Sequence, residues 1–316
     1  RRAFAIQERA LGSNHPSVAT SLNNLGFLYK VTGRYAKAEP VYQQALAIRE
    51  KELGPHHPDV AQSLNNLAFL AAARQNYAKA NNLFQRSLRI RDRHIQDVFA
   101  FTTEDQKLLF MGTIQWSQHA FLSLVHQFLG KDPVAVRAAV ESILQRKGII
   151  FDAQSRAREA VQGRLSEAGR KNWEQLSALR GELSRLLLNQ PKKMSPEAYQ
   201  EKIRSLQQEI EAVEKRLADE SALVAKELKQ RTITVEAAAK ALPKNAALVE
   251  FVKIVDFDFV KGKWAERDRY LAFVLTAAGE VTLVDLGDAA ELEKQARLVL
   301  EQIQTSIRKA RESQQS

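Results

Sequence analysis

The feature that most constrains this chain is a stretch of sequence that occurs twice, 42 residues apart. The first copy begins at Leu11 and the second at Leu53, and half of the aligned positions carry the same residue. The segment AFAIQE at 3–8 aligns with ALAIRE at 45–50, as the last helix of an earlier repeat would. Self-similarity at such a spacing is typical of solenoids, whose repeats bury their apolar faces against their neighbours. The sequence therefore predicts a helical solenoid.

Each copy has the pattern of a helix, a short turn and a second helix. Pro16 and Pro58 stand where a helix would begin, a position that tolerates the missing N–H. Gly33 separates the two helices of the first copy, and Pro40 would remove one hydrogen bond from the second turn of the second helix. Apolar residues recur on one face of each first helix. On that face, the small residue Gly26 would let the partner helix approach closely.

The shared blocks resemble a known family. LNNLGFLY and LNNLAFLA, the repeated YAKA, and the endings ALAIRE and SLRIRD are similar to tetratricopeptide repeats in their longer form, as in kinesin light chains. We expect a first domain over residues 1–94, with the last helix of one repeat followed by two full repeats. The resemblance implies a concave groove, lined by the first helix of each repeat, that receives a peptide or helix of a partner protein.

Candidate partner-binding residues lie on a stripe beside the buried face of each first helix. Steps of about 100° per residue place polar and aromatic side chains there, and an Asn can both donate to and accept from a peptide backbone. Alternatively, the Asn residues only bridge neighbouring repeats. Asn24 and Asn66 lie further round the helix and are expected to be structural. The predicted partner-binding residues are Thr20, Asn23, Phe27, Lys30, Gln62, Asn65 and Phe69.

Positive charge gathers in the repeats. Residues 1–100 carry 14 basic and 7 acidic side chains, and so +7 of the formal net charge of +10. Arg86, Arg89 and Arg93 share one face of a predicted helix, which would suit an acidic partner or nucleic acid. We favour the interpretation that these arginines lie on a solvent-exposed face. The basic residues are not interleaved with aromatic ones, and no motif that binds a DNA groove is present, so nothing points to nucleic acid. A protein or peptide partner is expected, and whether this partner is acidic stays open.

Residues 95–242 predict a helical connector. Asp132-Pro133 predicts the start of one helix, and Gly148 predicts its end. On both sides of the segment NQPKKMSP, apolar residues step by three and four, which predicts an antiparallel coiled-coil hairpin over about 164–229. This hairpin is either a lever or platform that projects from the body and contacts a partner, or a spacer whose apolar residues are buried within the hairpin itself.

The pattern changes after Pro243 to runs rich in β-branched and aromatic residues. Residues 246–254, 270–276 and 280–286 predict three strands, of which the last two form a hairpin. The charged segment KGKWAERDR between the first two predicts an exposed loop, and an amphipathic helix is predicted over 288–311. These elements make a small α/β layer that is incomplete as a domain.

This last part also resembles a known family. ALPKNAALVEFVKIVDFDF and RYLAFVLTAAGEVTLVDLGDAAELEKQ are similar to the opening of a CHAT domain, the caspase-like peptidase module found fused to tetratricopeptide repeats, mostly in bacteria. We expect this third domain over 243–316. The order of parts fits, since the repeats are followed by a connector with Arg146-Lys147-Gly148 and then the sheet. The resemblance implies a catalytic His and Cys further along a longer parent protein.

No residue carries over that catalytic pair. The sequence has no cysteine and no histidine after His126, whereas thiolate attack needs a Cys with a His as its base. There is no glycine-rich phosphate loop. His119 and His126 lie seven apart on one predicted face, but no third ligand is spaced to join them, so we interpret them as core or half-buried residues. We expect no catalytic residue, cofactor or metal in this stretch.

Together these features predict a mainly α protein: a tetratricopeptide solenoid, a connector with a coiled-coil hairpin, and an incomplete caspase-like sheet. Both ends of the sequence read as parts of helices, so we expect a piece of a longer protein. Its predicted role is to bind a regulator or substrate and pass that event to a caspase-like domain. The alternative is a scaffold without enzymatic output. With no apolar run or signal pattern, we expect a cytoplasmic protein without a membrane span, and its oligomeric state stays open.

Overall fold

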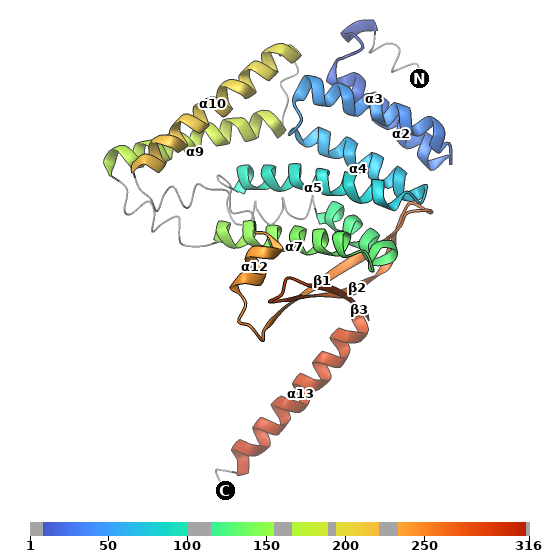
Figure 1. Ribbon diagram of the computed structural model, residues 1–316, viewed down its shortest axis with the longest axis vertical. Helices are drawn as coiled ribbons and strands as arrows, with labels where there is room; N and C mark the ends of the chain where they lie inside the picture. The colour runs from blue at the N-terminus through green and yellow to red at the C-terminus, as the bar shows by residue number, and fades with distance from the viewer. Residues whose placement is uncertain (1–8, 100–114, 155–165, 189–193, 221–232, 314–316) are drawn as a thin grey trace.

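A computed structural model describes residues 9–99, 115–154, 166–188, 194–220 and 233–313 of the chain. Antiparallel helix pairs are layered one on the next, and a three-stranded antiparallel sheet lies below the last layer (Figure 1). This is the mainly α solenoid with a small C-terminal sheet that the sequence predicts. Among the described helices, none is both long and apolar enough to cross a membrane.

Two helix pairs form the repeats. The first pair is α2 (Pro16–Val31) and α3 (Tyr35–Leu53), and the second is α4 (Pro58–Ala73) and α5 (Tyr77–Phe99). Both first helices begin at the prolines that the sequence marks as helix starts. Because α5 runs through residue 94, the predicted boundary of the first domain lies inside one helix, and the domain division stays a prediction.

The turn and packing residues of the first repeat have the predicted roles. Gly33 has a φ of +71°, in the left-handed region that favours glycine, and Pro40 lies inside α3. A Cβ added to Gly26 would lie 2.6 Å from Cε1 of Tyr42. Only a residue without a side chain fits this crossing of α2 and α3.

The connector begins with a helix over 115–124, which continues as the π-helix η1 (Val125–Leu129) and is followed by α7 (Pro133–Gln154). Asp132 caps α7 as expected, because its Oδ1 accepts the N–H of Val134 at 2.9 Å. The predicted end at Gly148 is wrong, since the helix continues through it to Gln154. The glycine instead allows close packing, because a Cβ there would clash with Ile233.

The predicted helical hairpin is formed by α9 (Glu167–Leu188) and α10 (Pro196–Glu220), which pack against each other. Ser195 caps α10. The hairpin turns back onto the repeats, where Leu53 at the end of α3 lies in one apolar cluster with Tyr199. Coiled-coil geometry stays a prediction.

The sheet contains β1 (Ala247–Asp258), β2 (Lys263–Thr276) and β3 (Val281–Asp288), in that order. The loop predicted for KGKWAERDR is wrong, because β2 begins at Lys263 and pairs with β1 from there onward. Charged side chains are compatible with this pairing, since the ladder uses backbone groups and these side chains are largely exposed. Only a short turn after Asp258 joins the two strands, which form a long ribbon.

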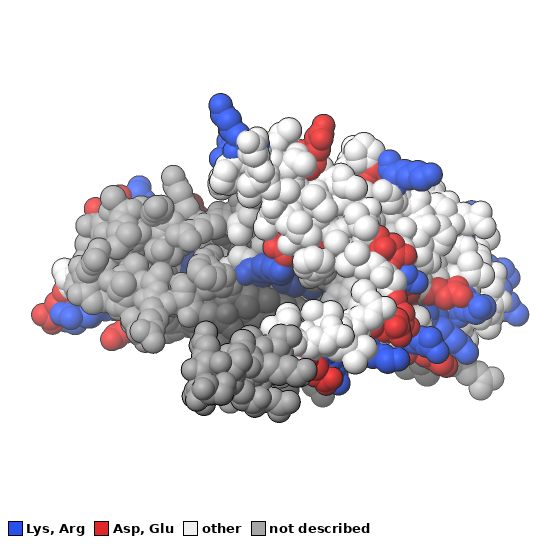
Figure 2. Space-filling model, turned by 90° about the horizontal axis from the view of Figure 1, so that it is seen from below, with Lys and Arg blue, Asp and Glu red and all other residues white. Residues whose placement is uncertain are grey.

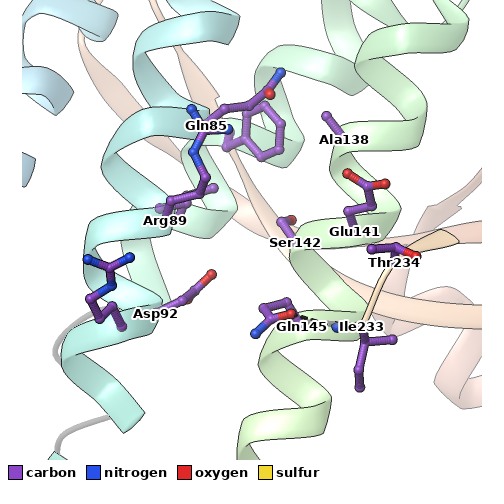
Figure 3. Close-up of a pocket in the computed structure, with 12 residues that line it drawn as sticks. Gln85, Arg89, Asp92, Ala138, Glu141, Ser142, Gln145, Ile233 and Thr234 are labelled. Atoms are coloured by element: carbon purple, nitrogen blue, oxygen red, sulfur yellow. Dashed lines mark hydrogen bonds between the residues drawn. The ribbon is translucent and has the colours of Figure 1, made fainter. Parts of the chain in front are cut away.

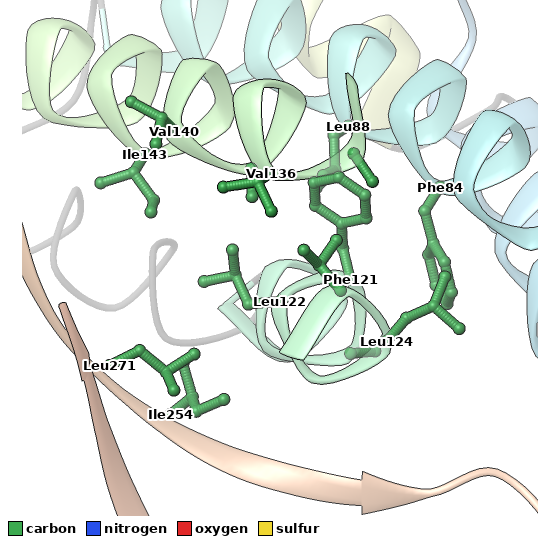
Figure 4. Packing of buried hydrophobic residues seen from close by; sticks show 14 of the residues in the cluster. Phe84, Leu88, Phe121, Leu122, Leu124, Val136, Val140, Ile143, Ile254 and Leu271 are labelled. Carbon is green, nitrogen blue, oxygen red and sulfur yellow. The ribbon is translucent and has the colours of Figure 1, made fainter. Parts of the chain in front are cut away.

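A single apolar cluster joins the repeats, the connector and one face of the sheet. The helix over 115–124 lies between α5 and α7 above and the strands below (Figure 4). Two further helices flank the sheet, α12 (Val235–Ala241) before it and α13 (Ala289–Ser313) after it. α13 extends away from the body (Figure 1). The labelled core residues are Phe84, Leu88, Phe121, Leu122, Leu124, Val136, Val140, Ile143, Ile254 and Leu271.

Candidate partner-binding groove

The open part of the predicted groove is formed by α2. Phe27 is 56% exposed and Lys30 is half-buried. The Nζ of Lys30 lies 5.8 Å from the ring centroid of Phe27 and 5.1 Å from that of Phe69, within range of cation–π attraction. Burial lowers the pKa of Lys30, and no carboxylate among the described residues pairs with it. This position therefore offers an aromatic face beside an uncompensated positive charge.

Asn23 lies buried between the two repeats. Its Nδ2 donates to Oγ of Ser63 at 3.1 Å, and its Oδ1 accepts from Nδ2 of Asn66 at 3.2 Å. Asn23 thus makes the inter-repeat bridge that the sequence left open as an alternative. Asn65 is also fully buried, and neither of its amide atoms has a hydrogen-bond partner within the described parts of the chain. Asn24, by contrast, is exposed.

Thr20 and Gln62 are exposed, and a buried arginine holds both of them. Arg49 on α3 is only 2% exposed. Its guanidinium donates to Oγ1 of Thr20 at 3.3 Å, to Oε1 of Gln62 at 3.2 Å and to the backbone oxygen of Asp59 at 2.9 Å. Burial lowers the pKa of Arg49, and the Asp59 carboxylate opposes this effect. The two polar residues therefore have fixed positions on the groove wall.

The predicted groove position on the second repeat is covered by the chain itself. Phe69, the equivalent of Phe27, is only 8% exposed. Its ring centroid lies 4.8 Å from that of Phe257 and 5.9 Å from that of Phe259, both at the turn between β1 and β2. Trp116 stacks on it at 6.1 Å. The β1–β2 tip, residues 257–264, thus covers the predicted partner-binding position of this repeat.

Further aromatic contacts hold the β1–β2 tip. Phe259 lies 6.4 Å from Phe84 and 6.1 Å from Phe128, and Phe257 lies 4.9 Å from Trp264. The backbone N–H of Phe257 donates to Oγ of Ser123 at 2.8 Å. No pattern near Phe69 predicts this contact, because the two segments lie far apart in the sequence. The aromatic alternation of VDFDFV is the one local signal for it.

A second unpredicted contact ties the helical hairpin to the repeats. Nδ1 of His57 accepts the N–H of Asp59 at 3.1 Å and caps α4. The ring proton is therefore on Nε2, which donates to Oη of Tyr199 at 2.9 Å. Tyr199 in turn donates to the backbone oxygen of Leu186 at 3.3 Å. Burial lowers the pKa of His57 to about 4, so this chain of hydrogen bonds uses the neutral imidazole.

Some of the charges on the repeats are paired across helices. Arg86 on α5 pairs with Glu50 on α3, whereas Arg89 and Arg93 form no ion pair with another described residue. Figure 2 views the molecule from below, on the side of the sheet and not of the repeats, and shows basic and acidic side chains interspersed on that face. That face shows no large basic patch of the kind that nucleic-acid binding uses.

The structure gathers no metal site from the histidines. Nδ1 of His119 accepts the N–H of Val255 at 3.4 Å, and Nε2 of His126 lies 3.8 Å from the Asp285 carboxylate. The described part of the chain contains no group of three side chains able to hold a metal ion. Both histidines instead help to position the sheet against the connector.

Stacked antiparallel helix pairs, bridged by polar side chains, define a helical solenoid. The tetratricopeptide repeat family model matches residues 1–51 and 18–93. Residues 1–93 are thus similar to tetratricopeptide repeats, a repeat type that suggests a role in protein–protein interaction. No curated protein matches the chain. The kinesin-light-chain type of the repeats and the CHAT resemblance stay predictions.

Proposed function

We propose that this chain is the sensor and connector portion of a TPR-CHAT protein. In this proposal the repeats bind a protein or peptide in their groove. The connector passes that event to a caspase-like cysteine peptidase domain whose catalytic part lies outside this sequence. The contact between the β1–β2 tip and Phe69 supports the proposal, because it joins the predicted output sheet directly to a predicted groove residue.

The proposed coupling uses the position of Lys30. A partner seated on Phe27 would touch Lys30, which also lies over Phe69. Phe69 in turn holds the β1–β2 tip. A ligand that interacts differently with the docked and undocked tip would shift the balance between these two states. The tip is thus the element that would report on occupancy of the groove.

The partner we propose is an acidic protein or peptide segment. Lys30 lacks a carboxylate partner among the described residues, and the repeats carry most of the positive charge of the chain. An acidic side chain beside Phe27 would compensate that charge. The partner-binding residues we propose for direct contact are Thr20, Phe27, Lys30 and Gln62, with Asn23, Asn65 and Phe69 forming the buried support beneath them.

Affinity measurements with a purified partner test the groove. Phe27→Ala and Lys30→Gln should each weaken binding by about tenfold or more, as expected for an aromatic anchor and a desolvated charge. Phe251→Ala is the control, because Phe251 is 60% exposed on the outer face of the sheet. If all three variants bind as the wild type does, the groove assignment is wrong.

Hydrogen exchange tests the connector. Partner binding should change the exchange of residues 250–265, although these residues do not touch the partner. If binding depends on Phe27 while hydrogen exchange at the β1–β2 tip does not change, the proposed coupling is wrong, but the proposed binding in the groove is retained. That result would favour the alternative, a scaffold that assembles partners through the repeats and the α9–α10 hairpin. Peptidase assays of the parent protein with and without the partner separate the two functions.

A further inference from the structure

A cavity of about 260 Å³ lies between α5 and α7, closed at one end by Ile233 and Thr234 (Figure 3). None of the predicted partner-binding residues lines it. Its floor is apolar, since Leu88, Phe121 and Ala138 line it together with Ile233. The site is therefore separate from the groove, and its chemistry is independent of the function proposed above.

The α5 wall of the cavity is positive. Arg89 and Arg93 stand one helical turn apart and line the cavity. Neither forms an ion pair with another residue in the described part of the chain. Asp92 also lines the cavity, but it is bound to Arg146, whose Nη2 lies 3.2 Å from Oδ1 of Asp92. Among the described side chains the two arginines therefore have no ion-pair partner, and guanidinium groups bind carboxylates by paired hydrogen bonds.

The α7 wall supplies acceptors and donors. Figure 3 shows Glu141, Ser142 and Gln145 on α7 across the cavity from Gln85 and Asp92 on α5. Among the described side chains, Glu141 pairs only with Arg137, at a long 3.7 Å, and so retains capacity to accept an N–H. The cavity combines a cationic end, an apolar floor and an anionic acceptor on the opposite wall.

We propose that this cavity binds an N-acylated amino acid with a free carboxylate and an apolar side chain, the chemistry of a peptide C-terminus. The carboxylate lies on Arg89 and Arg93, the amide N–H donates to Glu141, and the side chain rests on Leu88 and Phe121. The volume suits one residue, because it is slightly below the roughly 300–1,000 Å³ of sites for drug-sized ligands. A free cation is repelled by the arginines, and a neutral apolar molecule leaves them without a counter-charge.

Calorimetric titration of the full chain tests the proposal with N-acetyl-L-leucine against N-acetyl-L-leucinamide. The two differ only in the carboxylate, whose charge-assisted hydrogen bonds should make the acid bind about tenfold or more tightly. A pentapeptide ending in leucine distinguishes the two sources of this chemistry. Binding tighter than that of N-acetyl-L-leucine identifies a protein C-terminus as the ligand, and equal affinity identifies a free N-acyl amino acid.

Matched variants locate the binding. Arg89→Gln and Arg93→Gln should each weaken the acid about tenfold. The control Arg86→Gln should change its affinity by less than about twofold, because Arg86 lies on the same helix but pairs with Glu50 outside the cavity. Ala138→Phe, which fills the cavity and keeps both arginines, should abolish binding while circular dichroism confirms the fold. The proposal is overturned if acid and amide bind alike, if neither binds at millimolar concentration, or if Arg86→Gln matches Arg89→Gln.

Discussion

Truncation of Phe257 to Ala is the perturbation that most directly tests how the sheet is docked on the repeats. Its ring centroid lies 4.8 Å from that of Phe69, 5.2 Å from that of Phe259 and 4.9 Å from that of Trp264. Phe257 is 7% exposed, and buried Phe→Ala changes cost about 3–5 kcal/mol. Because the ring keeps some contact with solvent, we expect about 3 kcal/mol, the lower end of that range.

Hydrogen exchange at residues 64–72 of α4 and 250–265 of the ribbon measures this loss locally. A docking contact weaker by about 3 kcal/mol should raise the population of the undocked state by about two orders of magnitude. Both segments should then exchange faster, because each covers the other in the docked state. Phe251→Ala is the control on the same strand, where a 60% exposed side chain should contribute less than about 0.5 kcal/mol.

Two results would refute the docking argument. If Phe257→Ala speeds exchange only in the ribbon, then α4 does not depend on the β1–β2 tip for protection. If Phe251→Ala has an effect as large as that of Phe257→Ala, the loss is a general weakening of the sheet. Urea unfolding followed by circular dichroism reports the global stability against which both local effects are compared.

Three further perturbations probe the packing and the polar contacts. Gly26→Ala should destabilise the chain by about 1–3 kcal/mol, because the added Cβ would overlap the rigid ring of Tyr42. An unchanged urea midpoint would contradict the close packing of α2 against α3 at this position. Tyr199→Phe leaves the buried Nε2–H of His57 without its acceptor and should cost about 1–3 kcal/mol, again read from urea midpoints; no loss would mean that this contact is not formed. Acidification should destabilise the fold, because burial lowers the pKa values of His57 and His94 to about 4. Since the unfolded side chains titrate near 6.5, their contribution is complete above that pH and falls as pH drops toward 4, by at most about 3 kcal/mol for each group. Urea midpoints at pH 7 and pH 4.5 measure the loss, and equal midpoints would contradict the neutral, buried imidazoles.

The repeats could be predicted from sequence because their determinants are local. A helix start at Pro58, a left-handed turn at Gly33 and a missing side chain at Gly26 each act within one or two helices. Gly148 has the same local signature as a helix end, yet α7 continues through it. Its role depends on Ile233, which is distant in sequence, so helix-stop signals could not distinguish an end from a close approach.

The predicted groove residues are accessible only where nothing else covers the helix, and their role in binding stays a prediction. A helical wheel places Phe27 and Phe69 at equivalent positions, but the first is exposed and the second is buried by the β1–β2 tip. Likewise, Asn23 is buried because the next repeat supplies Ser63 as its partner. Spacing along one helix defines which residues share a face. The segments that cover that face are set by tertiary contacts that spacing does not contain.

The contacts that join the repeats to the connector and to the sheet differ in how firmly polar groups anchor them, and this difference indicates which contact can move. Arg146 and Asp92 form a buried ion pair between α7 and α5, and breaking such a pair leaves an unpaired buried charge. The β1–β2 tip is instead held mainly by aromatic rings, together with the backbone of Phe257, whose N–H donates to Ser123 and whose carbonyl oxygen accepts from Gln127. Apolar contacts can be exchanged for those of a ligand without leaving a charge unpaired. The tip is therefore the element best suited to two arrangements, which any coupling between the groove and the sheet requires.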